Sequence, residues 1–293
     1  MKPAPQMMAF LALVIAAVFW GSSFLVIQQT MVHDIWWMLC FRHFFGALGT
    51  FLLFRKQALK LPRKDLKLTL IISFWILVTF APQAIGLTGT SIANSAVITA
   101  LFVVFTPVIM FLMKRAKPTT MQWVGSLIGI SAFLLLGISQ GFTQLGFYDF
   151  LTLVTSIAVA FHVIYFTEAV STPGKLASIV FYQFFLSGII LALFATTNSL
   201  SQETFFQQSF SPKEWAGLAY LGLFSMALPY TLQGYAQTRL NPVQVVLVIS
   251  SEPLWAIGVA NLLRGDPVSG AALMASFILI IANLVAELKI KRR

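Results

Sequence analysis

Hydrophobic residues run along the chain in ten long stretches separated by short polar segments. A helix needs about 20 apolar residues to cross the hydrocarbon core of a bilayer, and each stretch is close to that length. The pattern therefore predicts an all-α membrane protein with ten transmembrane helices. The stretches cover residues 8–28, 36–54, 68–88, 91–113, 121–138, 148–167, 176–196, 214–234, 240–263 and 268–288.

Composition supports this class and excludes an ordinary soluble domain. Of 293 residues, 58% are hydrophobic and 10% are charged, and the mean hydropathy is +0.87. Soluble domains carry about 25% charged residues. The single cysteine, Cys40, cannot form an internal disulfide and fits no metal-ligand spacing, so we expect neither a metal nor a cofactor. Apart from residues 55–67 and 197–213 the loops are short, which leaves no room for a soluble catalytic domain and predicts no enzyme activity.

Positive charge falls on one side of the predicted membrane. The net charge of +10 would suggest nucleic acid in a soluble protein, but Lys and Arg concentrate in the cytoplasmic loops of membrane proteins. With the N-terminus inside, 16 of the 19 Lys and Arg residues are cytoplasmic, Lys213 and Arg264 lie on the other side, and Arg42 lies within a helix. We therefore predict N-in and C-in topology, a lipid bilayer as partner and no nucleic acid. The cytoplasmic group is Lys2, Arg55, Lys56, Lys60, Arg63, Lys64, Lys67, Lys114, Arg115, Lys117, Lys175, Arg239, Lys289, Lys291, Arg292 and Arg293.

The second half of the chain repeats the first. An offset of 146 residues places Thr106 on Glu252 and Pro107 on Pro253, and the hydropathy pattern then reads as five spans followed by five. An odd number of spans in each repeat inserts the second copy upside down. Inverted repeats are typical of secondary transporters, whose substrate site lies near the midplane. We predict a first repeat over residues 1–140 and a second over residues 141–293.

Of the residues in the predicted spans, Glu252 has the highest free-energy cost of insertion into lipid. A charged side chain at membrane depth is penalised by roughly 2.5–3.5 kcal/mol and normally faces a cavity, a partner or water. Pro253 beside it cannot donate a backbone hydrogen bond, so it frees a carbonyl near Ile249 that Ser250 or Ser251 could satisfy or offer to a ligand. Glu252 is either a proton-coupling carboxylate or a brace between helices. Pro107 and Pro253 are the predicted hinges.

A polar stripe in the eighth span offers further candidates. Tyr230, Gln233 and Gln237 recur at helical spacing, so they face a cavity or hydrogen-bond a neighbouring helix. The repeat places Gln83 in the opposite wall. We expect these side chains to contribute to a substrate site.

Three ionisable or aromatic residues in other spans have two interpretations each. His162 and Tyr165, one turn apart, form either a proton relay or a brace. Arg42 is always charged, so it either attracts carboxylate-bearing substrates or forms a structural ion pair.

Two tryptophans, Trp20 and Trp255, fall inside spans and not at the membrane interface, where Trp is usually enriched. A cavity lined by aromatic side chains and a few amides suits amphipathic or aromatic solutes. We expect both tryptophans to line such a cavity.

Several motifs, taken in order, carry a family resemblance. They are PheTrpGlySerSerPhe at 19–24, the arginine at 42, the run from Ser91 to Pro107, and its counterpart from Asn241 to Ile257. Their order and spacing resemble the ten-helix EamA type of the drug/metabolite transporter superfamily. The resemblance implies a multi-pass exporter or exchanger of small metabolites in the cytoplasmic (inner) membrane of a bacterium, with a central cavity between two five-helix repeats. Similar proteins carry GlyGlu after the fourth and ninth helices, whereas only the second half of this chain keeps an acid there, Asp266.

The leading hypothesis is a secondary active exporter of small organic metabolites, amino acids or related amphipathic solutes, which works by alternating access with proton antiport through Glu252. The alternatives are an uncoupled facilitator or exchanger, in which Glu252 is a gate or brace, and a non-transporting membrane protein such as a lipid-modifying enzyme. The second alternative has no HisGluxxHis or GlyxSerxGly motif to support it. The oligomeric state stays open, because the small-residue pairs Gly46/Gly49 and Gly125/Gly129 suit packing within or between chains.

Overall fold

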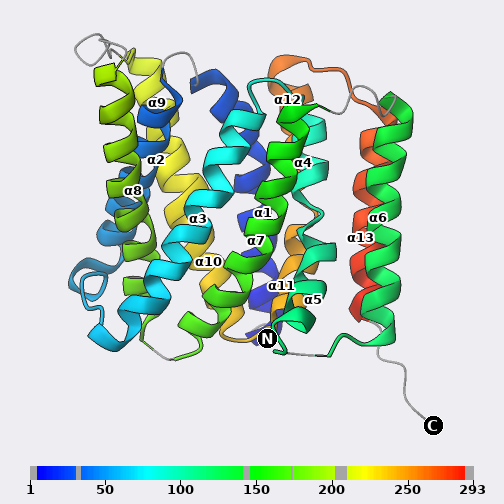
Figure 1. Cartoon of the computed structure of the whole chain (residues 1–293), viewed down its shortest axis with the longest axis horizontal. Coiled ribbons are helices and arrows are strands. Elements are labelled where there is room, and N and C mark those ends of the chain that lie inside the picture. The colour runs from blue at the N-terminus through cyan, green and yellow to red at the C-terminus, as the bar shows by residue number, and fades with distance from the viewer. Residues whose placement is uncertain are drawn as a thin grey trace.

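The apolar stretches of the chain form helices, and these helices pack side by side in one bundle (Figure 1). The structure, a computed structural model, describes residues 5–30, 34–115, 117–140, 146–172, 174–201 and 210–287. Every regular element within these ranges is helical. Seven helical segments in them are long and apolar enough to cross a membrane, so the chain is an all-helical protein with several candidate membrane spans.

Seven of the predicted stretches form uninterrupted helices, whose bounds differ from the expected ones by only a few residues. The loop after the second of these contains two short 3₁₀ turns, Arg55–Gln57 and Arg63–Asp65. The uninterrupted helices are α1 (Pro5–Thr30), α2 (Ile35–Phe54), α3 (Leu66–Gly86), α6 (Thr120–Gln140), α7 (Phe147–Val170), α8 (Leu176–Ser201) and α13 (Gly270–Glu287).

The other three stretches are interrupted, which the hydrophobic pattern did not predict. The stretch at 91–113 divides into α4 (Ile92–Thr99) and α5 (Phe102–Leu112), and the stretch at 240–263 divides into α11 (Pro242–Ile249) and α12 (Glu252–Arg264). The stretch at 214–234 forms α9 (Pro212–Gly222) and α10 (Leu228–Gln237), joined by a π-helical turn at Leu223–Ala227. Half-helices and π turns leave backbone groups free of their usual partners, which is common where a membrane protein binds its ligand.

Pro253 favours the break between α11 and α12, although the corresponding break between α4 and α5 has Val103 at that position. Pro253 has no N–H to donate to the carbonyl of Ile249, and its ring would clash with that carbonyl in a continuous helix. The chain therefore ends α11 at Ile249 and starts α12 at Glu252, so that Pro253 lies in the first turn, where an N–H is not needed. Pro253 thus follows a break between two helices, where we had expected a hinge within one span.

The helix starts give the register of the repeat. Ser91 caps α4 and Asn241 caps α11, each accepting a hydrogen bond from the backbone three residues later. These caps are 150 residues apart, and the same offset places Phe102, the first residue of α5, on Glu252. The predicted offset of 146 is therefore wrong by about one helical turn. Pro107 lies in the second turn of α5, so it does not occupy the position of Pro253.

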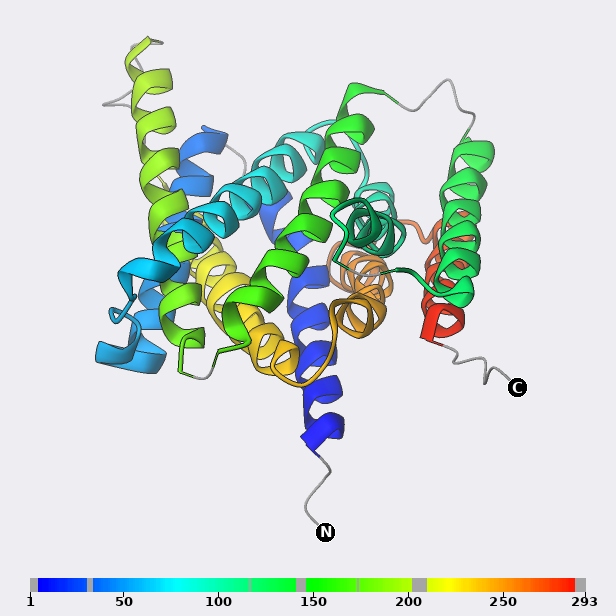
Figure 2. The ribbon, with the colours of Figure 1, turned by 60° about the horizontal axis from the view of Figure 1, so that its bottom comes forward.

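The helices form two outer groups with a central group between them. In Figure 1, α2, α8 and α9 lie at one edge, and α6 and α13 stand as a pair at the other edge. Between them α3 packs along α7, while α1 packs against α10 and α12 (Figure 2). The four half-helices α4, α5, α11 and α12 lie next to this central group, so their broken ends meet the middle of the bundle.

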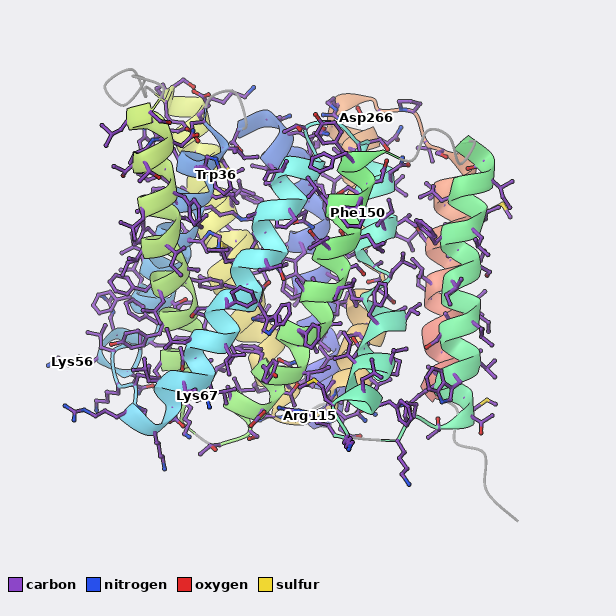
Figure 3. The ribbon with its side chains drawn as sticks, viewed as in Figure 1. Trp36, Lys56, Lys67, Arg115, Phe150 and Asp266 are labelled. Carbon is purple, nitrogen blue, oxygen red and sulfur yellow. The ribbon has the colours of Figure 1, made fainter. Side chains whose placement is uncertain are left out.

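The two ends of the bundle differ in charge. Lys56, Lys67 and Arg115 lie at one end, which we call the basic end, and Trp36 and Asp266 lie at the other, the opposite end (Figure 3). The start of α1 and the end of α13 both lie at the basic end (Figure 1). Five residues of the predicted cytoplasmic group lie outside the described residues: Lys2, Lys289, Lys291, Arg292 and Arg293.

The small-residue pairs on α2 and α6 are used for packing within the chain. A Cβ on Gly49 would lie 2.8 Å from Ala227 Cβ, and one on Gly125 would lie 2.4 Å from the carbonyl oxygen of Ala282. Gly46 and Gly129 likewise face other helices of the same chain. These glycines let α2 approach the π turn and α6 approach α13, so their spacing is explained without a second copy.

Candidate functional site

A cavity lies where the broken ends of α4–α5 and α11–α12 meet α1, α3, α7 and α10. Its volume is about 40 Å³, which is enough for about three water molecules. Aromatic and aliphatic side chains alternate around it with amides, hydroxyls, a histidine and one carboxylate. The lining residues are Trp20, Ser23, Thr79, Phe80, Gln83, Thr99, Phe102, Val159, His162, Val163, Tyr230, Gln233, Ile249 and Glu252.

The two halves of the chain contribute equally to this cavity. Seven lining residues belong to residues 1–140 and seven to residues 141–293. The offset of 150 residues pairs Gln83 on α3 with Gln233 on α10, and Phe102 on α5 with Glu252 on α12. The same offset pairs Phe80 with Tyr230 and Thr99 with Ile249. Corresponding positions of the two halves thus both line the cavity, and only the second half contributes an acid.

Glu252 is the acidic group of the cavity. It is the first residue of α12 and is 8% exposed. Its carboxylate forms no ion pair or hydrogen bond with any described residue. The first turn of a helix favours negative charge, because its N–H groups and the helix dipole point toward it. Glu252 is therefore a carboxylate that is available to a solute, water or proton in the cavity.

Tyr230 is the centre of the aromatic wall. Its ring lies edge-on to the rings of Trp20, His162 and Phe184, with centroid distances of 5.2, 5.3 and 5.3 Å. Such edge-to-face pairs contribute about 0.5–1.5 kcal/mol each beyond the area they bury. The wall therefore has a defined shape and joins α1, α7, α8 and α10.

His162 lines the cavity but already has a partner. Its Nε2 lies 3.0 Å from Oε1 of Gln183 on α8, and its ring stacks on Phe166 at 5.2 Å. Because an amide oxygen only accepts, Nε2 carries the proton in this arrangement. The contact is that of a brace between α7 and α8, and the relay interpretation would need this hydrogen bond to open.

The π turn positions Trp20 and Arg42 through Ser225. Pro229 has no N–H to donate to the carbonyl of Ser225, four residues earlier. Trp20 Nε1 donates to that carbonyl instead, at 3.0 Å, and Arg42 Nη2 donates to the Ser225 hydroxyl at 2.9 Å. Arg42 does not line the cavity; its guanidinium lies 4.1 Å from the ring centroid of Phe80, which does.

Of the eleven predicted site residues, six line the cavity: Trp20, Gln83, His162, Tyr230, Gln233 and Glu252. The other five, including Arg42, do not. Gln237 Nε2 donates to the carbonyl of Val163 and to the hydroxyl of Thr167, so it joins α10 to α7.

Tyr165, Ser251 and Trp255 are also placed away from the cavity. The ring of Tyr165 stacks under Arg115, 4.9 Å from its guanidinium. Trp255 is 38% exposed, and its Nε1 donates to the hydroxyl of Ser251 at 3.3 Å. We had expected all three to contribute to the site, but Ser251 is the N-cap of α12 and lies outside that helix.

Sequence reasoning missed more than half of the lining. The missed residues are hydroxyl or apolar side chains that carry no signal by themselves: Ser23, Thr79, Phe80, Thr99, Phe102, Val159, Val163 and Ile249. The capping residues Ser91 and Asn241 offered a signal, because aligning them gives the offset that pairs Phe102 with Glu252.

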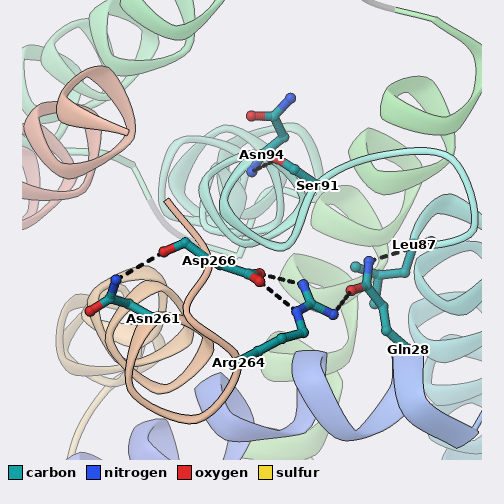
Figure 4. A network of polar contacts seen from close by, with 7 residues as sticks. All are labelled: Gln28, Leu87, Ser91, Asn94, Asn261, Arg264 and Asp266. Carbon is teal, nitrogen blue, oxygen red and sulfur yellow. Dashed lines mark hydrogen bonds and ion pairs between the residues drawn. The ribbon is translucent and has the colours of Figure 1, made fainter. Parts of the chain in front are cut away.

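At the opposite end a polar network joins the two halves (Figure 4). Arg264, the last residue of α12, donates through Nη1 to Gln28 Oε1 on α1 at 2.8 Å, and Gln28 Nε2 donates to the carbonyl of Leu87 at 3.2 Å. The other nitrogens of Arg264 donate to both carboxylate oxygens of Asp266. This pairing holds the pKa of Asp266 below its ordinary value of 3.8. We call this set of contacts the Gln28–Arg264 network.

The basic end carries two ion pairs between the halves. Arg115, just after α5, contacts Glu168 near the end of α7 at 2.6 Å, and Lys175, before α8, contacts Asp65, before α3, at 2.7 Å. The cavity therefore has contacts between the halves at both ends. Within the described residues, no group of His, Cys, Asp and Glu side chains is arranged to hold a metal ion.

Comparison with known proteins agrees with this architecture. No curated protein matches the sequence. A solved structure, described only as the crystal structure of a protein, is similar in fold: its TM-score is 0.70 at 14% sequence identity, over 95% of this chain and 96% of that chain. A model of the EamA-like transporter family matches residues 7–138 and again residues 146–286. The chain therefore belongs to the EamA-like transporter family of multi-pass membrane transporters.

Proposed function

We propose that this transporter exports small organic metabolites, amino acids or related amphipathic solutes, in exchange for protons that bind Glu252. The observation that carries the proposal is the central cavity, which is lined by corresponding residues of the two halves and by one buried carboxylate that forms no hydrogen bond or ion pair with the described residues. Aromatic walls would hold the apolar body of the solute, and the paired amides of Gln83 and Gln233 would orient its polar groups.

The fold supports alternating access of two inverted halves. If each interrupted stretch of the described residues is one crossing, the helices would make ten crossings, five in each half. Five crossings would give the second half the reverse orientation, and the cap-to-cap offset of 150 residues supports this relation. The basic end would face the cytoplasm under the positive-inside rule. We place the protein in the inner membrane of a bacterium on the family resemblance, with both ends of the chain inside.

Glu252 suits proton exchange because its surroundings change when the cavity opens. In this structure the carboxylate is buried beside His162 and Tyr230, in a cavity of about 40 Å³. Burial disfavours the ionised form of an acid and water entry favours it. A carboxylate that alternates between these environments binds a proton on one side of the membrane and releases it on the other.

The small volume of the cavity indicates that this is not the conformation with solute bound. About 40 Å³ is too small for an organic metabolite, while contacts at both ends join the halves. We interpret the state as substrate-free and closed. Opening at either end requires the contacts at that end to separate.

Uptake into proteoliposomes under an imposed pH gradient tests the proposal. Each proteinogenic amino acid is offered in radiolabelled form, and the wild type is expected to accumulate at least one above equilibrium. Glu252→Gln should abolish accumulation. Glu168→Gln, which removes a carboxylate at the basic end, should keep the dependence on the gradient. Accumulation that is unchanged in Glu252→Gln would show that protons do not couple through this residue, and simple equilibration by the wild type would show an uncoupled facilitator.

A further inference from the structure

Arg42 is a charged side chain at the centre of the protein with most of its donors unused. It is fully buried on α2. A guanidinium has five N–H donors, and the hydrogen bond from Nη2 to Ser225 uses one of them. The nitrogens Nε and Nη1 are buried and have no hydrogen-bond partner among the described residues.

Arg42 also lacks a direct ion pair. No carboxylate of the described residues lies within 4.0 Å of it, and the ion pairs of the described residues lie near the two ends of the bundle. Glu252 interacts with its charge from a longer distance. Arginine keeps its proton in proteins, and a buried cation with no counter-charge in direct contact is unfavourable. The Phe80 ring, at 4.1 Å, offers a cation–π contact, but an aromatic face does not replace a hydrogen-bonding anion.

The local structure holds this guanidinium in place. The π turn and Pro229 leave Ser225 free to bind Trp20 through its carbonyl and Arg42 through its hydroxyl. His43, the next residue, is fixed by a hydrogen bond from its ring to the carbonyl of Leu39 at 2.7 Å. A side chain that is held rigidly with free donors is preorganised for a ligand.

Phe80 separates Arg42 from the cavity. Phe80 lines the cavity, whereas Arg42 lies against the Phe80 ring and is not part of the lining. Because the cavity has a volume of about 40 Å³, an organic solute can enter only if lining side chains move. Movement of the Phe80 ring would enlarge the cavity and uncover the free donors of Arg42 in the same step.

The geometry points to Arg42 as the subsite for a carboxylate of the transported solute, covered by Phe80 until the solute enters. The solute class is then carboxylates with an apolar body, and a zwitterionic amino acid fits best, because its ammonium group can face Glu252 while its carboxylate binds Arg42. Simple amines are excluded from the class, since they would leave the arginine unpaired. This inference rests on the proposed transport function.

Binding of matched compounds to the purified full-length protein tests the inference. Each set contains an amino acid, the amine left after decarboxylation, and the acid that lacks the ammonium group; phenylalanine, phenethylamine and 3-phenylpropionate form one set. Corresponding sets are used for the other apolar amino acids. Binding is measured by equilibrium dialysis. We expect the bound compounds to be carboxylates, with the matching amines at least about tenfold weaker.

Variants separate the role of Arg42 from a loss of folding. Arg42→Gln should weaken carboxylate binding at least about tenfold, and Arg42→Lys should restore part of it. Arg239→Gln, an exposed arginine that stacks on Tyr235 at the basic end, should bind like the wild type. Phe80→Leu, which keeps Arg42 and changes its cover, should keep the preference for carboxylates over the matching amines.

Three results would overturn the inference: binding of none of the carboxylates, amines that bind as tightly as the acids, or full carboxylate binding by Arg42→Gln. In these cases Arg42 would serve only as a fixed positive charge near Glu252. Transport of amines that depends on Glu252 would overturn the carboxylate subsite and leave the proposed function in place. Proteoliposomes that carry no solute at all would instead contradict the proposed function.

Discussion

Replacing Gly21 with alanine tests how closely α1 and α12 approach at the level of the cavity. Gly21 faces the first turns of α12. A Cβ at this position would lie 2.6 Å from Trp255 Cβ, 2.8 Å from the amide nitrogen of Ala256 and 2.9 Å from the carbonyl oxygen of Glu252. These atoms belong to the backbone or are attached to it, so no side-chain rotation can remove the overlap.

The size of the effect follows from these distances. Contacts below 3.4 Å are already tight for a Cβ, so the two helices would have to move apart by roughly 0.5–0.8 Å, and overpacking of this kind costs about 1–3 kcal/mol. Alanine is itself favoured over glycine in a helix by about 1 kcal/mol. Gly258→Ala provides a matched control, because Gly258 lies on α12 with nothing within 4 Å of its added Cβ.

Thermal unfolding of the two purified variants in detergent gives the measurement. The helix preference is common to both, so the difference between them reports the overlap alone. With about 2–4 °C per kcal/mol for a chain of this size, Gly21→Ala should unfold roughly 2–12 °C below Gly258→Ala. Because the overlap includes the backbone of Glu252, we also expect slower proton-linked transport in Gly21→Ala. Equal unfolding temperatures and equal transport would refute the close contact between α1 and α12.

Two further predictions concern the Gln28–Arg264 network. Arg264→Gln should speed hydrogen exchange in residues 87–91 and 265–269 about two- to tenfold, because a partly exposed ion pair and its hydrogen bonds contribute on the order of 1 kcal/mol; unchanged exchange would show that the network does not hold this end closed. Asp266→Asn should leave the pH profile of transport unchanged between about pH 5 and 8. The lowered pKa of Asp266 keeps its carboxylate ionised throughout this range, and its contribution is lost only as the pH falls below the ordinary value of 3.8. A shifted profile in Asp266→Asn would contradict this assignment.

The helical class and most helix ends could be predicted from hydropathy because lipid leaves few alternatives. The interruptions could not be predicted in the same way. A stretch of apolar residues has the same hydropathy whether its helix is continuous or broken. A proline shows only which backbone N–H is missing. At Pro253 the chain responds with a new helix, whereas at Pro107 the helix α5 continues.

Sequence analysis could predict the polar and charged residues of the candidate site, because lipid disfavours such side chains. It could not predict the apolar and hydroxyl residues of the site. Glu252, Gln83 and Gln233 had to face a cavity or partner, and they line the cavity. Phe102 and Thr99 suit lipid, core and cavity equally, so only the spatial arrangement identifies them. Trp255 shows the reverse error: we expected it to line the cavity because it falls inside a predicted span, but it lies on the exposed side of the half-helix α12.

The corresponding half-helices α5 and α12 run from the cavity to different ends of the bundle. From Phe102 the chain of α5 leads to Arg115, which pairs with Glu168 at the basic end, and from Glu252 the helix α12 leads to Arg264 at the opposite end. Only the second path starts at an acid.

A helix of 13 residues extends about 20 Å. If α12 moves as one body, a change in charge or contacts at Glu252 would be transmitted along it to the Gln28–Arg264 network, while α5 offers no titrating group at its cavity end. We infer that protonation and solute binding act first on the opposite end, and that the basic end responds through the halves as a whole. Only one of the two corresponding positions, Glu252 and not Phe102, carries an acid. This difference between the halves would thus set the direction of the transport cycle.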